Sequence, residues 1–149
     1  MKQAVRAIII RGDSLLVMHR SKFGDQYYTL IGGGIGVGET PEMALARELH
    51  EETGLRVVNP RLVFVEDAGS FYGRQYVFLC DDPGGDIAMH PQADEAHIGS
   101  GGVNVYTPLW LSIAQLPTVP FLSNNLRRRL IDGLERGWPV QTETFTTQH

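Results

Sequence analysis

The sequence predicts an α+β fold, and two kinds of pattern along the chain indicate it. Apolar, β-branched runs separated by turn residues predict strands, and two segments with capping residues and helical spacing predict helices. With 149 residues, no internal repeat and no linker, the chain is most simply one domain over residues 1–149.

The predicted strands begin with a hairpin near the N-terminus. Residues 4–10 and 15–18 are apolar runs, and Gly12-Asp13-Ser14 supplies turn chemistry between them. A third strand is predicted over residues 27–31. Later strands are predicted at 61–66, 75–80 and 103–111, the first two as a pair around Ala68-Gly69-Ser70.

The first predicted helix begins at Thr40-Pro41-Glu42. Thr40 suits the N-cap, Pro41 the first helical position and Glu42 the positive end of the helix dipole. Gly54 is the expected residue just past the C-terminus. A second helix is predicted over residues 123–137. Its apolar face consists of Leu126, Leu130, Ile131 and Leu134.

Three segments are predicted to be irregular. Residues 32–38 hold five glycines in seven positions, which predicts a loop whose backbone can approach another group closely. Residues 81–102 are rich in Gly, Asp, Pro and His without periodicity, and such a long stretch in a compact domain is often functional. The threonine-rich tail from about residue 140 is predicted to be frayed.

Composition argues against several functional classes. The net charge of −4 disfavours broad nucleic-acid binding, so no stable nucleic-acid partner is expected. No apolar run approaches a membrane span, no secretory h-region precedes Arg11, and the chain is predicted to be cytoplasmic. The one cysteine, Cys80, lies in an apolar run and is expected to be a buried small side chain.

Three carboxylates crowd one face of the first predicted helix. Glu48, Glu51 and Glu52 lie three and four residues apart, and like charges at that spacing cost about a few tenths of a kcal/mol each. Such a cluster predicts a bound cation. Hard divalent ions such as Mg²⁺ take carboxylate oxygens and keep waters that a phosphate can replace, so they are the natural candidates.

The acidic helix and the glycine-rich segment before it share one pattern. Residues 33–55 read G-x5-E-x7-R-E-L-x-E-E-x-G-L, with fixed positions at Gly33, Glu39, Arg47, Glu48, Leu49, Glu51, Glu52, Gly54 and Leu55. This pattern resembles the Nudix box of MutT-like hydrolases, which act on nucleoside diphosphates linked to another moiety. The chain departs from the family at Ile31, where proline is frequent, and at Gly36, where an acidic residue is common.

The resemblance implies a fold, a reaction and a set of site residues. The fold is a mixed β-sheet sandwiched between α-helices, and the reaction is pyrophosphate hydrolysis with Mg²⁺ or Mn²⁺. The implied metal ligands are Glu48, Glu51, Glu52 and the backbone carbonyl of Gly32. The three glutamates are also expected to be catalytic residues, together with Arg47 and Glu95. The small-molecule nucleotide is the implied partner, and a homodimer is suggested by the family alone.

The neighbours of these ligands have expected roles of their own. Arg47 lies four residues before Glu51 and is expected to hold it in a bidentate pair. Glu39 either braces the loop or contacts the metal. Gly33 and Gly34 are expected to bind substrate phosphate, because backbone N–H groups and the helix dipole favour anions there.

The general base is open between two kinds of residue. Either a glutamate of the box or an acid on a loop takes the proton of the attacking water. Glu95 is the leading loop candidate, followed by Asp94 and His97, although an ordinary solvated loop acid is the competing interpretation of Glu95.

Aromatic side chains bear on the substrate, since a nucleobase needs a flat partner for stacking. Phe23 and Tyr72, beside predicted loops, are the candidates for substrate binding, whereas Tyr28 and Tyr76 lie in predicted strands and are expected in the core. Nucleoside triphosphates, dinucleoside polyphosphates and nucleotide sugars all remain candidate substrates.

Two other functions compete with hydrolysis on the same fold. One is a non-catalytic module that senses a nucleotide, which has no need of the repulsive glutamate cluster. The other is isomerase chemistry, which would want a cysteine near the site, and Cys80 in a strand run does not suit it.

Overall fold

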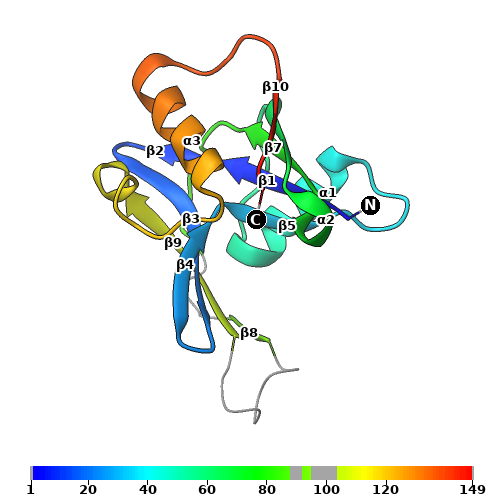
Figure 1. The fold of residues 1–149 in the computed structure, drawn as a ribbon. Coiled ribbons are helices and arrows are strands. Elements are labelled where there is room, and N and C mark those ends of the chain that lie inside the picture. The colour runs from blue at the N-terminus through cyan, green and yellow to red at the C-terminus, as the bar shows by residue number, and fades with distance from the viewer. Residues whose placement is uncertain (1, 88–91, 95–103, 149) are drawn as a thin grey trace.

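The computed structural model describes residues 2–87, 92–94 and 104–148 (Figure 1). Its strands are β1 (Gln3–Ile8), β2 (Ile10–Arg11), β3 (Ser14–Lys22), β4 (Asp25–Thr29), β5 (Ile31–Gly34), β6 (Arg61–Asp67), β7 (Arg74–Leu79), β8 (Gln92–Asp94), β9 (Asn104–Ser112) and β10 (Glu143–Thr146). Its helices are α1 (Pro41–Thr53), α2 (Gly69–Tyr72), the 3-10 turn η2 (Ile113–Gln115) and α3 (Asn124–Arg136). Among these described helices none is long and apolar enough to cross a membrane.

The strands form two sheets. The first has the order β10-β6-β7-β1-β5 and is mixed, because β1 runs parallel to β7 and β10 parallel to β6 while the other pairs are antiparallel. The second is antiparallel, with the order β2-β3-β9-β8 and with β4 paired to β3. The β3–β4 hairpin projects from the body of the molecule (Figure 1). The predicted strand pair at 61–66 and 75–80 is confirmed as β6 and β7, with α2 in their connection.

The mixed sheet lies between α1 and α3. Alternate side chains of a strand point to opposite faces, and Val5 of β1 packs in one apolar core with Leu45 and Leu49 of α1. Its near neighbour Ile8 packs in the other core with Leu126 of α3. The α+β class and the expected sheet between helices are therefore confirmed.

Helix α1 forms where the sequence predicts it. The Thr40 Oγ1 atom accepts the Met43 N–H at 3.2 Å, which satisfies one of the unpaired donors of the first turn. Gly54 ends the helix in the left-handed conformation, with φ of 78°, and its N–H donates to the His50 carbonyl at 2.9 Å.

The N-terminal apolar run divides between the two sheets, which the sequence does not reveal. Only β2 forms the predicted hairpin with β3, through the pairs Ile10 with Leu15 and Arg11 with Ser14. Strand β1 pairs instead with β7 and β5. Long-range pairing of β1 thus takes the first half of the run, and the hairpin prediction is right only for the second half.

The prediction of a loop over residues 32–38 is wrong for its first half. Gly32, Gly33 and Gly34 belong to β5 and pair with β1. A β-carbon at Gly32 would lie 1.8 Å from the Val5 carbonyl oxygen, and one at Gly33 would lie 2.5 Å from the Glu48 carboxyl carbon. Glycine is needed here because the strand is pressed against its neighbours, and only residues 35–38 of the predicted loop are irregular.

The predicted fraying of the C-terminal tail is also wrong. Residues 143–146 form β10, which pairs in parallel with β6. Its Phe145 side chain is buried, and its ring meets the Phe64 ring edge-on with centroids 6.0 Å apart. One buried aromatic in a polar run gives no strand pattern, so only the tertiary pairing identifies this edge strand.

Cys80 is buried, as predicted. Burial, followed by the nearby charge of Asp81, raises the pKa of its thiol to about 12. The thiol therefore stays protonated at neutral pH, which fits a small core side chain and not a nucleophile.

Candidate active site

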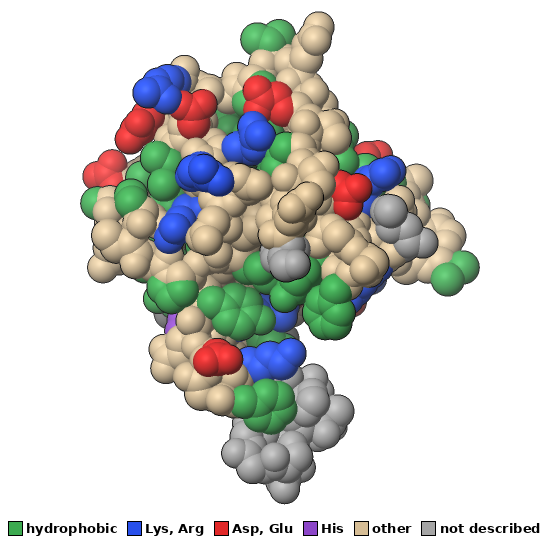
Figure 2. Space-filling view, viewed as in Figure 1, with side chains coloured by type: hydrophobic (Ala, Val, Ile, Leu, Met, Phe, Trp, Pro, Cys, Tyr) green, Lys and Arg blue, Asp and Glu red, His purple; other side chains and the backbone are tan. Residues whose placement is uncertain are grey.

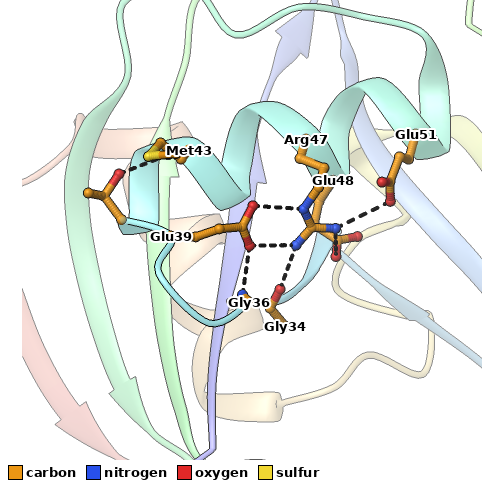
Figure 3. A network of polar contacts seen from close by, with 8 residues as sticks. Gly34, Gly36, Glu39, Met43, Arg47, Glu48 and Glu51 are labelled. Carbon is orange, nitrogen blue, oxygen red and sulfur yellow. Dashed lines mark hydrogen bonds and ion pairs between the residues drawn. The ribbon is translucent and has the colours of Figure 1, made fainter.

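Arg47 ties together the acidic side chains at α1 (Figure 3). Its Nε and Nη2 atoms donate to both Glu39 oxygens, at 2.8 and 2.9 Å. Its Nη1 atom donates to Glu48 at 3.0 Å and to Glu51 at 3.3 Å. The predicted bidentate pair with Glu51 is therefore wrong, because the fork of the guanidinium is taken by Glu39. We call this group the α1 acidic cluster: Glu39, Arg47, Glu48, Glu51 and Glu52.

Glu39 braces the loop before the helix. Its Oε1 atom accepts the Gly36 N–H at 2.6 Å, while Arg47 Nη2 also donates to the Gly34 carbonyl at 3.0 Å. Hydrogen bonds from Arg47, and then from Gly36, lower the pKa of Glu39 to about 2, and the same contact raises the pKa of Arg47. A β-carbon at Gly36 would lie 2.7 Å from Glu39 Oε1, so the glycine at this family-variant position allows the contact.

Glu48 and Glu52 form a pair of contacting carboxyl groups. Burial, followed by a hydrogen bond with Glu48, raises the pKa of Glu52 to about 8. The backbone of Gly33 lies directly against the Glu48 carboxyl group. Glu51 is more exposed and turns toward Arg47. Among the described residues, no three acidic, histidine or cysteine side chains gather closely enough to hold a metal ion in this arrangement.

The donor chemistry nevertheless fits a hard divalent ion. Two carboxyl groups in contact supply oxygen ligands, and burial, followed by the hydrogen bond and the charge of Glu48, raises the pKa of Glu52. A bound cation would favour the ionised form of both groups. The sequence-predicted glutamates are thus brought together as a pair, Glu48 with Glu52, and Glu51 is held nearby through Arg47.

A half-buried arginine, Arg6, lies close to this cluster and is not among the site residues that the sequence predicts. Burial, and then the charge of Arg20, lower the pKa of Arg6 to about 10, while Glu52 and Glu48 act on it in the opposite direction. Arg6 pairs with Gly32 across β1 and β5. The sequence does contain a sign of this residue, because Arg6 is the one charged residue in the apolar run over residues 4–10.

Arg6 lies among a set of polar side chains on the α3 side of the mixed sheet. Its Nε atom donates to Gln75 Oε1 at 3.0 Å. Glu66 is 2% exposed, and its Oε2 atom accepts hydroxyl protons from Ser123 and Thr147 at 2.5 and 2.6 Å. We call the residues that line this place the buried polar cluster: Arg6, Thr29, Glu66, Gln75 and Ser123.

The two aromatic candidates for substrate binding lie on one groove. Phe23, which is 49% exposed, and Tyr72 both line a hollow of about 540 Å³ that Tyr27 and Phe121 complete. Hydrophobic side chains gather on this face between the β3–β4 hairpin and the body of the molecule (Figure 2). The groove has the volume of a small-molecule site.

The loop candidates for the general base are not placed. Glu95 and His97 lie outside the described residues. Asp94 ends β8, of which the backbone alone is described.

Comparison with known proteins identifies the family of this acidic, glycine-flanked helix. The family model named NUDIX domain matches residues 1–132. The chain belongs to the NUDIX domain family. A NAD-capped RNA hydrolase NudC from Shigella dysenteriae serotype 1 is 30% identical over 124 residues, which are 83% of this chain and 44% of that protein. The corresponding protein of Pectobacterium atrosepticum is 29% identical over 124 residues, covering 83% of this chain and 43% of that protein.

The chain therefore spans less than half the length of these NUDIX relatives. Solved structures agree on the fold. The MutT protein of Bacillus halodurans has a TM-score of 0.69 and 16% identity, over 99% of this chain and 91% of that one. An ADP-ribose pyrophosphatase of Streptococcus suis has a TM-score of 0.66 and 23% identity, over 98% of each chain.

Proposed function

We propose that this NUDIX domain is a divalent-metal-dependent pyrophosphohydrolase. Its substrate is a nucleoside diphosphate linked to another moiety. The observation that carries the proposal is the α1 acidic cluster, in which Glu48 and Glu52 are in contact beside the Gly33 backbone while Arg47 fixes Glu39 and Glu51. A solvated helix face would not need this loop, this spacing and a half-buried pair of contacting carboxyl groups together.

The residues divide into ligands and organisers. Glu48, Glu51, Glu52 and the Gly32 carbonyl would hold the Mg²⁺ or Mn²⁺ ion. A bound ion would neutralise phosphate charge and make a water molecule more acidic for attack at phosphorus. Arg47 and Glu39 hold the loop in a fixed position against the helix, because their hydrogen bonds join Gly34 and Gly36 to α1.

The substrate moiety beyond the pyrophosphate is proposed to lie in the groove of Phe23 and Tyr72. Their rings suit stacking of a base. Arg6 lines a cavity that shares Tyr72 and Leu122 with the groove, and the charges of Glu52 and Glu48 act on it. The relatives named NAD-capped RNA hydrolase make NAD a candidate, since NAD joins two nucleosides through a pyrophosphate. Nucleoside triphosphates, dinucleoside polyphosphates and nucleotide sugars complete the panel.

The deciding experiment measures phosphate and nucleotide release from that panel with and without Mg²⁺ or Mn²⁺. Activity should require the ion, disappear in EDTA and fall at least about 10²-fold in Glu51→Gln. Glu42→Gln is the matched control, because Glu42 is an exposed acid in the first turn of the same helix. Activity that survives EDTA refutes the metal mechanism, and nucleotide binding without any cleavage identifies a nucleotide-sensing module instead.

The general base, the location and the assembly state stay predictions. Glu95→Gln should cost about 10²-fold in kcat if Glu95 is the base, and a loss within about threefold assigns that role to a glutamate of the box. Cell fractionation checks the cytoplasmic location, and sedimentation of the purified chain checks the homodimer.

A further inference from the structure

A small cavity opens beneath the groove of Phe23 and Tyr72. The two hollows share Tyr72 and Leu122, and the deeper one has a volume of about 40 Å³. Such a space holds a water-sized polar group but not an aromatic ring. A planar ligand in the groove can therefore insert only an edge substituent into the cavity.

The cavity is lined by polar side chains that are almost fully buried. Thr29 is 5% exposed, and its Oγ1 atom is buried without a hydrogen-bond partner. A buried hydroxyl left unpaired costs about 1–3 kcal/mol, so its retention calls for an explanation. Glu66 is 2% exposed and uses Oε2 for both of its hydroxyl contacts, from Ser123 and Thr147, which leaves Oε1 for another donor.

Most other polar groups of the cavity already bond to the protein. Arg6 donates through Nε to Gln75 and through Nη1 to the Leu30 carbonyl, at 3.0 and 3.2 Å, and Gln75 Nε2 donates to the Tyr72 carbonyl at 2.8 Å. The groups with capacity left for a ligand are therefore one carboxylate oxygen, which only accepts a proton, one hydroxyl, and the remaining N–H groups of Arg6, which only donate.

We propose that this cavity selects nucleotides whose base carries an exocyclic amino group, with Glu66 accepting its N–H and Thr29 bonding the adjacent ring atom. This inference rests on the proposed function and names the substrate class for it. An oxo group in the same place would set two lone-pair oxygens against each other and leave Glu66 unpaired, which is how a buried polar site rejects an analogue.

The test compares pairs of substrates that keep the phosphate chain constant and differ at the base edge that carries the amino group. ITP replaces the amino group of GTP by hydrogen, whereas UTP and nicotinamide hypoxanthine dinucleotide replace the amino group of CTP and of NAD by an oxo group. The amino member of each cleaved pair should have a kcat/KM at least about tenfold higher, mainly through KM. Wild-type ratios within about threefold overturn the inference while leaving the proposed function intact.

Two variants separate recognition of the base by Glu66 from a structural role of Glu66. Glu66→Gln retains an acceptor for the hydroxyl groups but presents N–H to the cavity, so the ratio should collapse to about one or invert. Thr147→Ala removes one contact of Oε2 from outside the cavity and should keep the ratio. A Glu66→Gln protein that keeps the wild-type ratio overturns the inference.

Thr29→Val provides an independent readout, and it decides the matter if Glu66→Gln does not fold. Removing an unpaired buried hydroxyl should leave stability unchanged or raised, while KM for amino-bearing nucleotides should rise at least about threefold. An unchanged KM contradicts the proposal. If no nucleotide is cleaved, the proposed function fails, and calorimetric binding of GMP against IMP then tests the cavity alone: a tighter GMP supports it, and equal affinities overturn it.

Discussion

The α1 acidic cluster and the buried polar cluster both contain arginine and glutamate, yet they are built in opposite ways. The first lies within residues 39–52 of one loop and helix, carries excess negative charge and is partly exposed. The second draws on β1, β4, β6, β7 and the start of α3, and Glu66 is 81 residues from its partner Thr147. The comparison teaches that the local cluster concentrates acidic groups for chemistry although they repel one another. The cluster built from distant segments also holds the sheet and the helix together.

The largest effect is expected when a carboxyl group of the contacting pair in the α1 acidic cluster is replaced by an amide. Glu52→Gln should lower kcat by at least about 10³-fold, because a metal ligand is lost. The metal-free variant should be about as stable as the wild type at neutral pH, because a pKa of about 8 keeps the Glu52 carboxyl largely protonated and an amide can also donate to Glu48. Steady-state kinetics and urea unfolding measure the two quantities, and a clear loss of stability would place Glu52 with the structural cluster instead.

The next effect concerns the fork of Arg47. Arg47→Lys keeps the charge but cannot bind both Glu39 oxygens and the Gly34 carbonyl, so kcat should fall about 10- to 100-fold. Arg11→Lys is the matched control, because Arg11 grips Asp82 with two bonds of 2.8 Å outside either cluster. Equal losses in both variants would show that general stability, and not the acidic cluster, sets the effect.

Helix caps near the two clusters allow a direct comparison of stability. Ser123 accepts the Leu126 N–H at 3.1 Å and also donates to Glu66, so Ser123→Ala should lower the free energy of unfolding by about 2 kcal/mol. Thr40 caps α1 through Met43 alone, and Thr40→Ala should cost about 1 kcal/mol or less. Urea titrations of both variants measure this, and the reverse ranking would contradict the contrast.

The smallest expected effect is the acid sensitivity of the first cluster. The pKa of Glu39 in the folded chain is about 2, against an ordinary 4.5, so its ionised form binds Arg47 more tightly in the folded state. This contribution is fully present above pH 4.5 and is lost as the pH falls through about 2. The melting temperature of the wild type should therefore drop more steeply than that of Glu39→Gln between these values, and parallel curves would refute the contribution.

The residues that the sequence predicted well are those whose partners lie close along the chain. Helix α1, its cap at Thr40, its stop at Gly54 and the acidic face were all readable from spacing. The errors about strands share one cause. Gly32 in β5 and Phe145 in β10 belong to strands whose partners lie far away in sequence, and neither has a local pattern that announces the pairing.

The sequence by itself therefore determined the α+β class, the family resemblance and the composition of the α1 acidic cluster. A helix fixes the relative directions of Glu48, Glu51 and Glu52 through its own hydrogen bonds. Only the tertiary structure decided that Arg47 grips Glu39, that Phe23 and Tyr72 share a groove, and that Glu66 faces a cavity with Thr29. The groove and the cavity depend on how the sheets, α2 and α3 pack, and packing between distant segments leaves no periodicity along the chain. The contact of Arg47 with Glu39 depends instead on the path of the loop that precedes α1.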